Sequence, residues 1–306
     1  MPPEPPRGAE LGARLREGDL SAAPAVLNLV ESRSREAREQ TEALLAALSP
    51  AELGAEARAH IVGVTGPPGV GKSSLLSRLV AEWRARDRSV AVLAVDPSSR
   101  RSGGSLLGDR ARIEYDPRDR AVFIRSTAAG DRLGGLAPAT RAAAGALAAA
   151  FDMVVIETVG VGQSETEVAD VADTVAVIVQ PGSGDVLQFL KAGIMEVPDV
   201  LVVTKADLGR VAMRTLADLR AALRSLGARE TAVLAVSSMA PATGIGALVD
   251  ALDAHRDRLN LAARRLRSRR LHALADFATE HGERGLRALG GRREACLLYT
   301  SDAADE

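Results

Sequence analysis

The 306-residue chain lacks several features that would place it in whole classes of protein. It has one cysteine, Cys296, so neither a disulfide framework nor a cysteine-based metal site can form within one chain. Aromatic residues make up 2% of the sequence, which argues against a stacking platform for single-stranded nucleic acid. No run of 18 apolar residues occurs, so no membrane-spanning helix is expected.

An excess of charge of either sign is also missing. The 39 basic and 40 acidic residues leave a formal net charge of -1, so no basic surface for nucleic acid is indicated. The first ten residues are proline-rich and acidic, without the apolar stretch of a secretory signal. We therefore expect a cytoplasmic protein with neither a nucleic-acid partner nor a membrane partner.

The 46% of apolar residues suffice for a globular core, and their pattern changes along the chain. After a frayed tail of about ten residues, apolar residues recur at helical spacing up to Pro50, which we expect to end the last of these helices. From His60 onward, short β-branched runs alternate with helical segments. The expected strands are 60–66, 90–95, 122–124, 153–157, 174–179, 200–203 and 232–236; the expected helices are 73–86, 136–150, 186–197, 208–226 and 245–259.

Most of these strands are continuous apolar runs, which is typical of strands buried on both faces of a largely parallel sheet. The sequence therefore predicts an α/β fold in which helices flank a mostly parallel central sheet. We expect a helical extension at 1–59, a core domain at 60–260 and a helical segment at 261–293, whose five arginines between 264 and 270 form a solvated face. Residues 294–306 contain CLLYTSDAADE, which we interpret as a translated sequencing adapter that truncates the C-terminal arm.

A phosphate-binding loop follows the first strand of the core. The segment GPPGVGKS matches G-x-x-x-x-G-K-[ST] in full and leads into a helix, the context that favours a nucleotide site over a chance glycine-rich turn. Small residues let successive backbone N–H groups surround phosphate oxygens, and the N-terminus of the following helix adds partial positive charge. Lys72 is placed to reach the β- and γ-phosphates, and the Ser73 hydroxyl to ligate Mg²⁺. The predicted nucleotide contacts of this loop are Gly66, Pro67, Pro68, Gly69, Val70, Gly71, Lys72, Ser73 and Ser74.

Carboxylates follow two further strands. Asp96 ends one strand and begins a polar, glycine-rich stretch that reaches Asp109, and Glu157 ends another strand shortly before Gly160. Because ligands bind at the carboxyl edge of open α/β sheets, these oxygen ligands suit a Mg²⁺–triphosphate. A strand-end carboxylate followed three residues later by glycine resembles the Walker B and switch II element, in which the carboxylate holds the Mg²⁺ shell and the glycine N–H, here that of Gly160, can meet the γ-phosphate. Asp96 and Asp109 can alternatively serve as a helix cap and a turn residue.

A base-reading element is expected near the end of a later strand. Thr204-Lys205-Ala206-Asp207 resembles the [N/T]-K-x-D element of GTPases, in which the aspartate accepts hydrogen bonds from guanine N1–H and N2–H₂ and lysine covers the ring. The alternative for Asp207 is a cap on the helix that follows it. Ser237, Ser238 and Met239 follow the next strand, at a position that suits a backbone contact to the guanine oxygen.

Three longer strings make the resemblance specific to one family. VAVLAVDPSSRRSGGSLLGD, FDMVVIETVGVGQSE and QPGSGDVLQFLKAGIMEVPDVLVVTKAD are similar to the MeaB/ArgK-type P-loop GTPases, the methylmalonyl-CoA mutase-associated group, over residues 10–280. The resemblance implies a GTP/GDP- and Mg²⁺-binding chaperone that gates cofactor loading and protection of an adenosylcobalamin-dependent acyl-CoA mutase. It also implies a homodimer. It assigns the Mg²⁺ shell to Ser73, Asp96, Asp109 and Glu157.

The resemblance further implies that residues 182–191 sense the partner, with Lys191 accelerating hydrolysis on the complex; an exposed helical lysine is the alternative. In the expected reaction, water attacks the γ-phosphorus in line while Lys72, Mg²⁺ and backbone donors neutralise charge. No glutamine directly follows Gly160, so Gln163 is the candidate for positioning water. We expect slow intrinsic turnover that a partner stimulates.

Three other functions compete with this interpretation. A nickel-insertion or other cofactor-insertion GTPase needs a metal store, but the four histidines (60, 255, 272 and 281) are widely spaced. A protein-targeting GTPase needs a methionine-rich or strongly basic module, and the chain has five methionines. An ATP-dependent kinase would prefer ATP over GTP, so competition between the two nucleotides decides that case.

Overall fold

The computed structural model describes residues 7–96, 113–128, 136, 138–158, 164–182, 198–228 and 230–291. The chain divides into two compact units, Met1–Arg258 and Leu259–Glu306. The first unit begins with α1 (Arg7–Arg16), η1 (Leu20–Ala22), α2 (Ala23–Glu31), α3 (Arg35–Ala47) and α4 (Pro50–Leu53). Its strands are β1 (His60–Thr65), β2 (Val90–Asp96), β3 (Val122–Ala128), β4 (Met153–Thr158), β5 (Thr174–Val179), β6 (Val200–Val203) and β7 (Ala232–Ala235). Its other helices are α5 (Lys72–Ala85), α6 (Pro138–Leu147), α7 (Ser164–Val171), η4 (Ala206–Leu208), α9 (Arg210–Ser225) and α10 (Ile245–Asp257).

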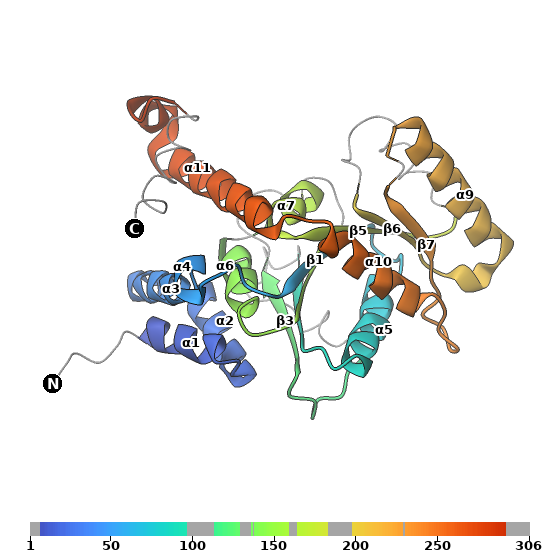
Figure 1. Cartoon of the computed structure of the whole chain (residues 1–306), viewed down its shortest axis with the longest axis horizontal. Coiled ribbons are helices and arrows are strands. Elements are labelled where there is room, and N and C mark those ends of the chain that lie inside the picture. Colours follow the sequence, from blue (N-terminus) through green and yellow to red (C-terminus); the bar gives the residue numbers. More distant parts are fainter. Residues whose placement is uncertain are drawn as a thin grey trace. The chain divides into compact units, whose positions relative to one another are not determined.

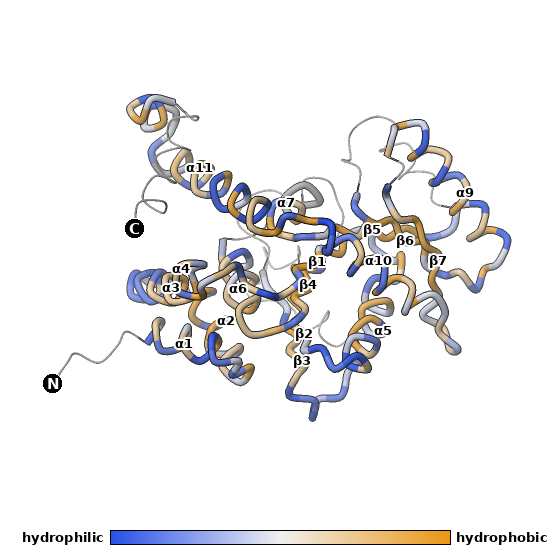
Figure 2. The backbone as a smooth tube through the Cα atoms, viewed as in Figure 1, coloured by the Kyte–Doolittle hydropathy of each residue, from blue (hydrophilic) through white to orange (hydrophobic). Residues whose placement is uncertain are grey.

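Within the described residues, the seven strands form one sheet in the order β3-β2-β4-β1-β5-β6-β7, and every pairing is parallel. Every residue of β1, β4, β5 and β6 is buried. Figure 2 shows these strands as hydrophobic along most of their length, whereas α9 alternates between hydrophobic and hydrophilic residues. The predicted fold class, a mostly parallel sheet flanked by helices, is confirmed.

Helices flank this sheet (Figure 1), and two hydrophobic clusters lie on its opposite faces. On one face, side chains of α5 and α10 such as Leu75, Trp83 and Leu248 pack on alternate residues of the central strands. On the other face, α6, α7, α9 and the N-terminal helices contribute a second cluster. Because both faces are covered, the strands need no polar side, which explains their unbroken apolar runs.

The N-terminal helices belong to the same compact unit as the sheet. Leu15, Leu27 and Leu44 are fully buried in the cluster that also contains α6 residues. The helices α1 and α3 approach so closely at Gly8 that a Cβ there would lie 1.8 Å from the carbonyl oxygen of Gln40. The N-terminal extension is therefore built as a packed layer rather than as a loosely attached segment.

Several element boundaries differ from the sequence-based expectations. The first helix already begins at Arg7, inside the expected tail, because Leu11 and Leu15 bury its inner face. Pro50 begins α4 instead of ending a helix: Ser49 caps α4, and proline suits the first helical position, where its missing N–H has no partner to lose. The short helix α7 was not expected, and β3 extends to Ala128. The predicted helix 186–197 lies outside the described residues.

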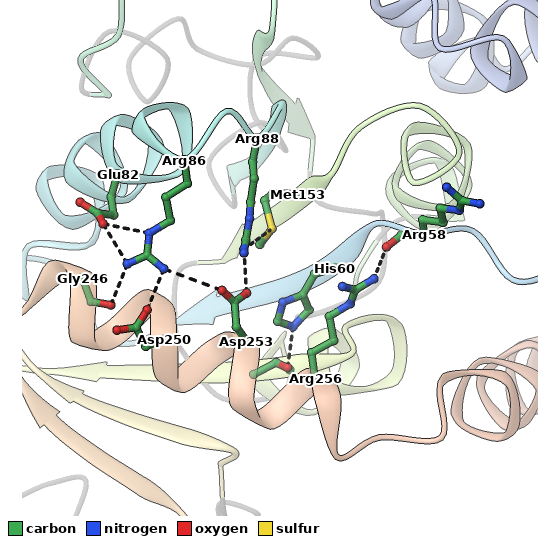
Figure 3. Close-up of polar contacts among 11 residues, drawn as sticks. Arg58, His60, Glu82, Arg86, Arg88, Met153, Gly246, Asp250, Asp253 and Arg256 are labelled. Carbon is green, nitrogen blue, oxygen red and sulfur yellow. Dashed lines mark hydrogen bonds and ion pairs between the residues drawn. The ribbon is translucent and has the colours of Figure 1, made fainter.

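A polar network joins α5 and α10 on one face of the sheet (Figure 3). Arg86, the C-cap of α5, donates to Glu82 of that helix (3.0 Å), to Asp250 of α10 (2.7 Å) and to the carbonyl of Gly246 (3.4 Å). Arg88, just after α5, reaches Asp253 of α10 at 2.7 Å. These contacts fix the helix that follows the phosphate loop against the last helix of the unit.

His60, at the start of β1, belongs to a buried part of this region. Its Nε2 atom lies 2.7 Å from the hydroxyl oxygen of Thr174, which in turn lies 2.8 Å from Nδ1 of His255. The Nδ1 atom of His60 is buried with no hydrogen-bond partner among the described residues. Burial of the ring lowers the pKa of His60 to about 4, and the attraction of the nearby Asp173 carboxylate opposes this shift only in part.

The second unit is described here by itself. Its helix α11 (Leu261–Ala288) begins at Asn260, whose side chain accepts a hydrogen bond from the Ala263 N–H at 3.1 Å. Gly282 interrupts the helical backbone with a φ of 66°, so the helix is kinked there. Residues 292–306, including Cys296, lie outside the described residues. In the part of the chain that the structure describes, no helix has both the length and the apolarity needed to cross a membrane.

The buried His60 predicts a pH-dependent stability. Its pKa is about 6.5 in the unfolded chain and about 4 in the folded chain, so the unfolded state binds more protons between these values. The contribution of His60 to the free energy of unfolding is therefore fully present above pH 6.5 and is lost as the pH drops toward 4. Between pH 7 and pH 5 the free energy of unfolding falls by about 2 kcal/mol. Urea unfolding at both pH values measures this loss.

In the His60→Gln variant, the part of the pH dependence that His60 contributes should disappear, since glutamine keeps a polar side chain but does not titrate. His281→Gln is the matched control, because that histidine is exposed on α11. An unchanged pH dependence in His60→Gln would contradict the assignment.

Candidate functional site

The chemistry-bearing segments meet at the carboxyl edge of the sheet around β1. This strand lies between β4 and β5, and its last residue, Thr65, leads directly into the phosphate loop. Strand β4 ends one residue after Glu157, which pairs with Val64 of β1 and with Ala94 of β2. Strand β6 ends just before Thr204. Parallel strands end at the same edge, so the sheet brings these segments together from distant parts of the sequence.

The phosphate loop depends on close backbone approach at its first glycine. Gly66 has a φ of 150°, and a Cβ there would lie 2.2 Å from the carbonyl oxygen of Ile178 in β5. At the other end, Gly71 has a φ of 95° and forms the N-cap of α5, so the backbone N–H groups of the first turn of α5 face the loop. Only glycine at position 66 leaves the space that this turn requires.

Lys72 turns back onto the loop from the first residue of α5. Its Nζ donates to the carbonyl of Gly66 at 2.7 Å and to that of Pro67 at 3.0 Å, and the side chain is 6% exposed. An ammonium held inside the loop by backbone carbonyls is pre-positioned for phosphate oxygens at the same place. The other predicted loop contacts include the exposed Pro68, Gly69 and Ser74, the half-buried Gly71 and Ser73, and the buried Val70.

The predicted Mg²⁺ ligands fall partly within the described residues. Glu157 is 7% exposed, and it lies on the same face of β4 as Met153 and Val155, which pack toward α5. Asp96 is the last residue of β2, but its side chain is outside the described part; Asp109, Gly160, Gln163 and Lys191 also lie outside it. A carboxylate and the Ser73 hydroxyl are oxygen donors of the kind Mg²⁺ prefers, so the donor set fits this ion. Among the described residues, no group of three or more His, Cys, Asp or Glu is gathered for a metal.

A row of buried hydroxyls lies at the same edge. Thr65, Thr127 and Thr158 are at most 3% exposed, and their hydroxyl oxygens have no hydrogen-bond partner among the described residues. Thr127 and Thr158 both pair with Val95, so these residues stand in one line across the strands. Unpaired buried hydroxyls cost free energy, so this edge retains hydrogen-bonding capacity for a polar ligand.

The segment Thr204–Asp207 is tied to the phosphate loop by two hydrogen bonds. The Thr204 hydroxyl donates to the carbonyl of Val70 at 2.6 Å and also lies 3.0 Å from that of Val179. The Lys205 Nζ donates to the carbonyl of Gly69 at 3.3 Å. Thr204 is 3% exposed, so its side chain connects the two segments instead of standing open to solvent.

Asp207 is oriented by a neighbouring loop. Its Oδ1 accepts a hydrogen bond from the buried Ser237 hydroxyl at 2.7 Å, and that hydroxyl accepts one from the Met239 N–H at 3.2 Å. The following helix, α9, has Gly209 rather than Asp207 as its N-cap. The capping alternative for Asp207 is therefore wrong, and the carboxylate is exposed while held in one orientation.

The structure adds two polar residues that the sequence patterns did not indicate. Gln180, just after β5, accepts a hydrogen bond from the Lys205 Nζ at 2.6 Å. Arg78 of α5 donates through Nε to the carbonyl of Ser238 at 3.0 Å. Gln180 begins the family-like string QPGSGDVLQFLKAGIMEVPDVLVVTKAD, but the resemblance gives it no role, and Arg78 lies outside the motifs. The contacts of the two residues span 25 and 160 residues of sequence. Gln180 directly follows β5, and that position at a strand end could have signalled it, whereas Arg78 lies in the middle of α5.

The phosphate loop lies between the buried strand β1 and helix α5, and the segment Thr204–Asp207 lies at the same edge of the sheet. This arrangement defines a P-loop nucleoside triphosphatase. The chain belongs to the MeaB family: the family profile described as "Methylmalonyl Co-A mutase-associated GTPase MeaB" matches residues 23–284. The family resemblance seen in the sequence is thereby confirmed.

Individual relatives agree with this assignment. A protein of Pyrococcus abyssi that is named as a GTPase is 41% identical over 269 residues, which is 85% of this chain and 80% of the relative. The "Methylmalonic aciduria type A homolog, mitochondrial" of Caenorhabditis elegans is 40% identical over 237 residues, covering 73% of this chain and 59% of the relative. The solved structure of a LAO/AO transport system kinase superposes with a TM-score of 0.68 at 27% identity, over 96% of this chain and 87% of that one. The chain is a GTPase.

Loss of the Lys72 ammonium should abolish tight GTP binding. In the Lys72→Ala variant, at least two charge-assisted hydrogen bonds to phosphate are lost, so we expect affinity to fall by about a hundredfold or more. Isothermal titration with GTP measures the change. Arg224→Ala is the control: it removes one positive charge at the far end of α9, where that residue is exposed. Equal affinities in both variants would contradict the role of Lys72.

Replacing Asp207 should change which purine is bound. Asparagine cannot accept from both guanine N1–H and N2–H₂, but its amide can donate to the additional carbonyl of xanthine. We therefore expect Asp207→Asn to lose about a hundredfold in GTP affinity and to gain affinity for XTP. Competition binding with GTP, XTP and ATP tests this, with the exposed Asp218→Asn on α9 as the matched control. Unchanged GTP preference in Asp207→Asn would remove the base-reading assignment.

Proposed function

We propose that this GTPase is a chaperone of an adenosylcobalamin-dependent acyl-CoA mutase of the methylmalonyl-CoA type. In this proposal, GTP binding and hydrolysis gate the loading of the cobalamin cofactor and the protection of the mutase. The observation that carries the proposal is the family match over residues 23–284, since the family is described as mutase-associated. The name of the Caenorhabditis elegans relative connects that protein with methylmalonate metabolism and supports the same partner.

Nucleotide binding follows from contacts already made in the loop. Lys72 exchanges the carbonyls of Gly66 and Pro67 for oxygens of the β- and γ-phosphates, while backbone N–H groups at the start of α5 surround them. Asp207, held by Ser237, reads the guanine edge. Because these groups are fixed before the nucleotide arrives, little reorganisation is needed when charge develops on the γ-phosphate.

Ser73, Asp96, Asp109 and Glu157 are the proposed ligands of Mg²⁺. The ion, when bound, neutralises charge on the phosphate oxygens. Glu157 supplies a carboxylate from a rigid strand between β1 and β2, which fixes its distance from the loop. Gly160 as a γ-phosphate contact, Gln163 as a water-positioning group and Lys191 as an accelerating group on the complex remain proposals.

The proposed regulation requires that the protein hydrolyse GTP slowly when the mutase is absent. Side chains that complete a catalytic site only in a complex contribute nothing to the free enzyme, so intrinsic turnover is low and the mutase raises it. Homodimerisation of the family type remains a prediction for this chain.

Single-turnover GTP hydrolysis with and without the mutase tests the proposal. We expect a rate increase of about tenfold or more with the apo mutase, at saturating GTP, because the partner orders groups that surround the γ-phosphate. A mutase unrelated to cobalamin is the control partner, and Lys72→Ala is the control enzyme. Fast hydrolysis that no cobalamin-dependent mutase accelerates would count against the chaperone function while leaving the GTPase assignment intact.

A further inference from the structure

Gln180 lies where β5 leaves the sheet, next to the base-reading segment. Its Oε1 accepts a hydrogen bond from the Lys205 Nζ at 2.6 Å, which is shorter than the 3.3 Å between the same nitrogen and the carbonyl of Gly69. Both bonds come from the same charged ammonium, so the shorter distance makes Gln180 the stronger of these two anchors. The glutamine side chain is half-buried, which limits competition from water.

The anchored ammonium fixes the whole Lys205 side chain. The residue has a φ of 53°, in the left-handed region, so its backbone leaves β6 at a sharp turn. From there the four-carbon stem must reach both Gly69 and Gln180, and it therefore spans the gap between the end of β6 and the phosphate loop. Held in this way, the apolar stem of Lys205 lies beside the place where Asp207 would bind the base.

The backbone around Gln180 is itself held on both sides. The carbonyl of Val179 accepts hydrogen bonds from both the N–H and the hydroxyl of Thr204. Two residues after Gln180, the Gly182 N–H donates to the Thr215 hydroxyl of α9 at 3.2 Å. The glutamine therefore projects from a fixed point, and its side chain can hold Lys205 in one place.

We propose that Gln180 is a positioning residue for the nucleotide base: it fixes Lys205 so that the lysine stem forms one wall of the purine site. The proposal rests on the GTP-binding function proposed above and adds a residue to which the sequence motifs assign no role. Gln180 acts through Lys205, so its contribution is to binding of the base and is the same in the ground state and the transition state.

The chemistry of the side chain defines the variants. Gln180→Ala removes the acceptor, and the freed lysine must be ordered again when nucleotide binds. Ordering a long charged side chain reduces affinity by about three- to tenfold, the lower value applying if Gly69 still restrains it. Gln180→Glu keeps an acceptor at the same reach and should restore affinity. Gln40→Ala is the matched control, because the Gln40 Oε1 also accepts a single hydrogen bond, from the Gly8 N–H at 2.8 Å, in the N-terminal helical layer.

The test measures GDP affinity by titration and GTP hydrolysis by steady-state kinetics on the full chain. For Gln180→Ala we expect GDP affinity to fall about three- to tenfold and KM for GTP to rise by the same factor, with kcat unchanged. In a Lys205→Ala background, the same substitution should have no further effect, because the group it positions is gone. Thermal unfolding without nucleotide shows whether each variant is folded.

Three outcomes would overturn the proposal: wild-type affinity in Gln180→Ala, an undiminished effect of Gln180→Ala in the Lys205→Ala background, or a fall in kcat with KM unchanged. A failure of the base-reading function would give a different experimental result. If the wild-type chain binds ADP as tightly as GDP, the role of Asp207 is lost, whereas the coupling between Gln180 and Lys205 is still measured by the same double-variant cycle with either nucleotide.

Discussion

The site depends on the contact between the base-reading segment and the phosphate loop. Two successive loop carbonyls, those of Gly69 and Val70, accept hydrogen bonds from Lys205 and Thr204. These residues are separated by more than 130 positions and come together only because β1 and β6 both neighbour β5 in a parallel sheet. The register of the sheet therefore sets the distance between the two ends of the nucleotide site.

Helix α5 transmits this arrangement to the rest of the core. Its first residue, Lys72, lies in the loop, and Arg78 holds the carbonyl of Ser238 beside the base-reading loop. Just beyond the end of the helix, Arg86 is fixed to Asp250 and Arg88 to Asp253 of α10. The helix and the two arginines after it thus contact the phosphate end, the base end and the neighbouring helix α10 on the same face of the sheet.

The sequence predicted the sheet well because both faces are covered, so that each strand stands out as an unbroken apolar run. It indicated the phosphate loop and Thr204–Asp207 because both are local motifs at strand ends, and the structure brings Lys72, Glu157, Lys205 and Asp207 to one edge; base reading by Asp207 stays a prediction. It did not predict Gln180 or Arg78, since each is defined by a partner far away in the chain. Helix starts were missed at Arg7 and Pro50, where burial and capping, rather than periodicity, decide the boundary.

The use of lysine in this chain has a practical consequence. Only three of the 39 basic side chains are lysines, and both of those within the described residues, Lys72 and Lys205, donate to carbonyls of the phosphate loop. The remaining positive charge is carried by arginine, which does not react with acylating reagents at neutral pH. Two of the three lysine ammonium groups thus lie at this loop, so a label selective for primary amines would report on it against only Lys191 and the N-terminal amine.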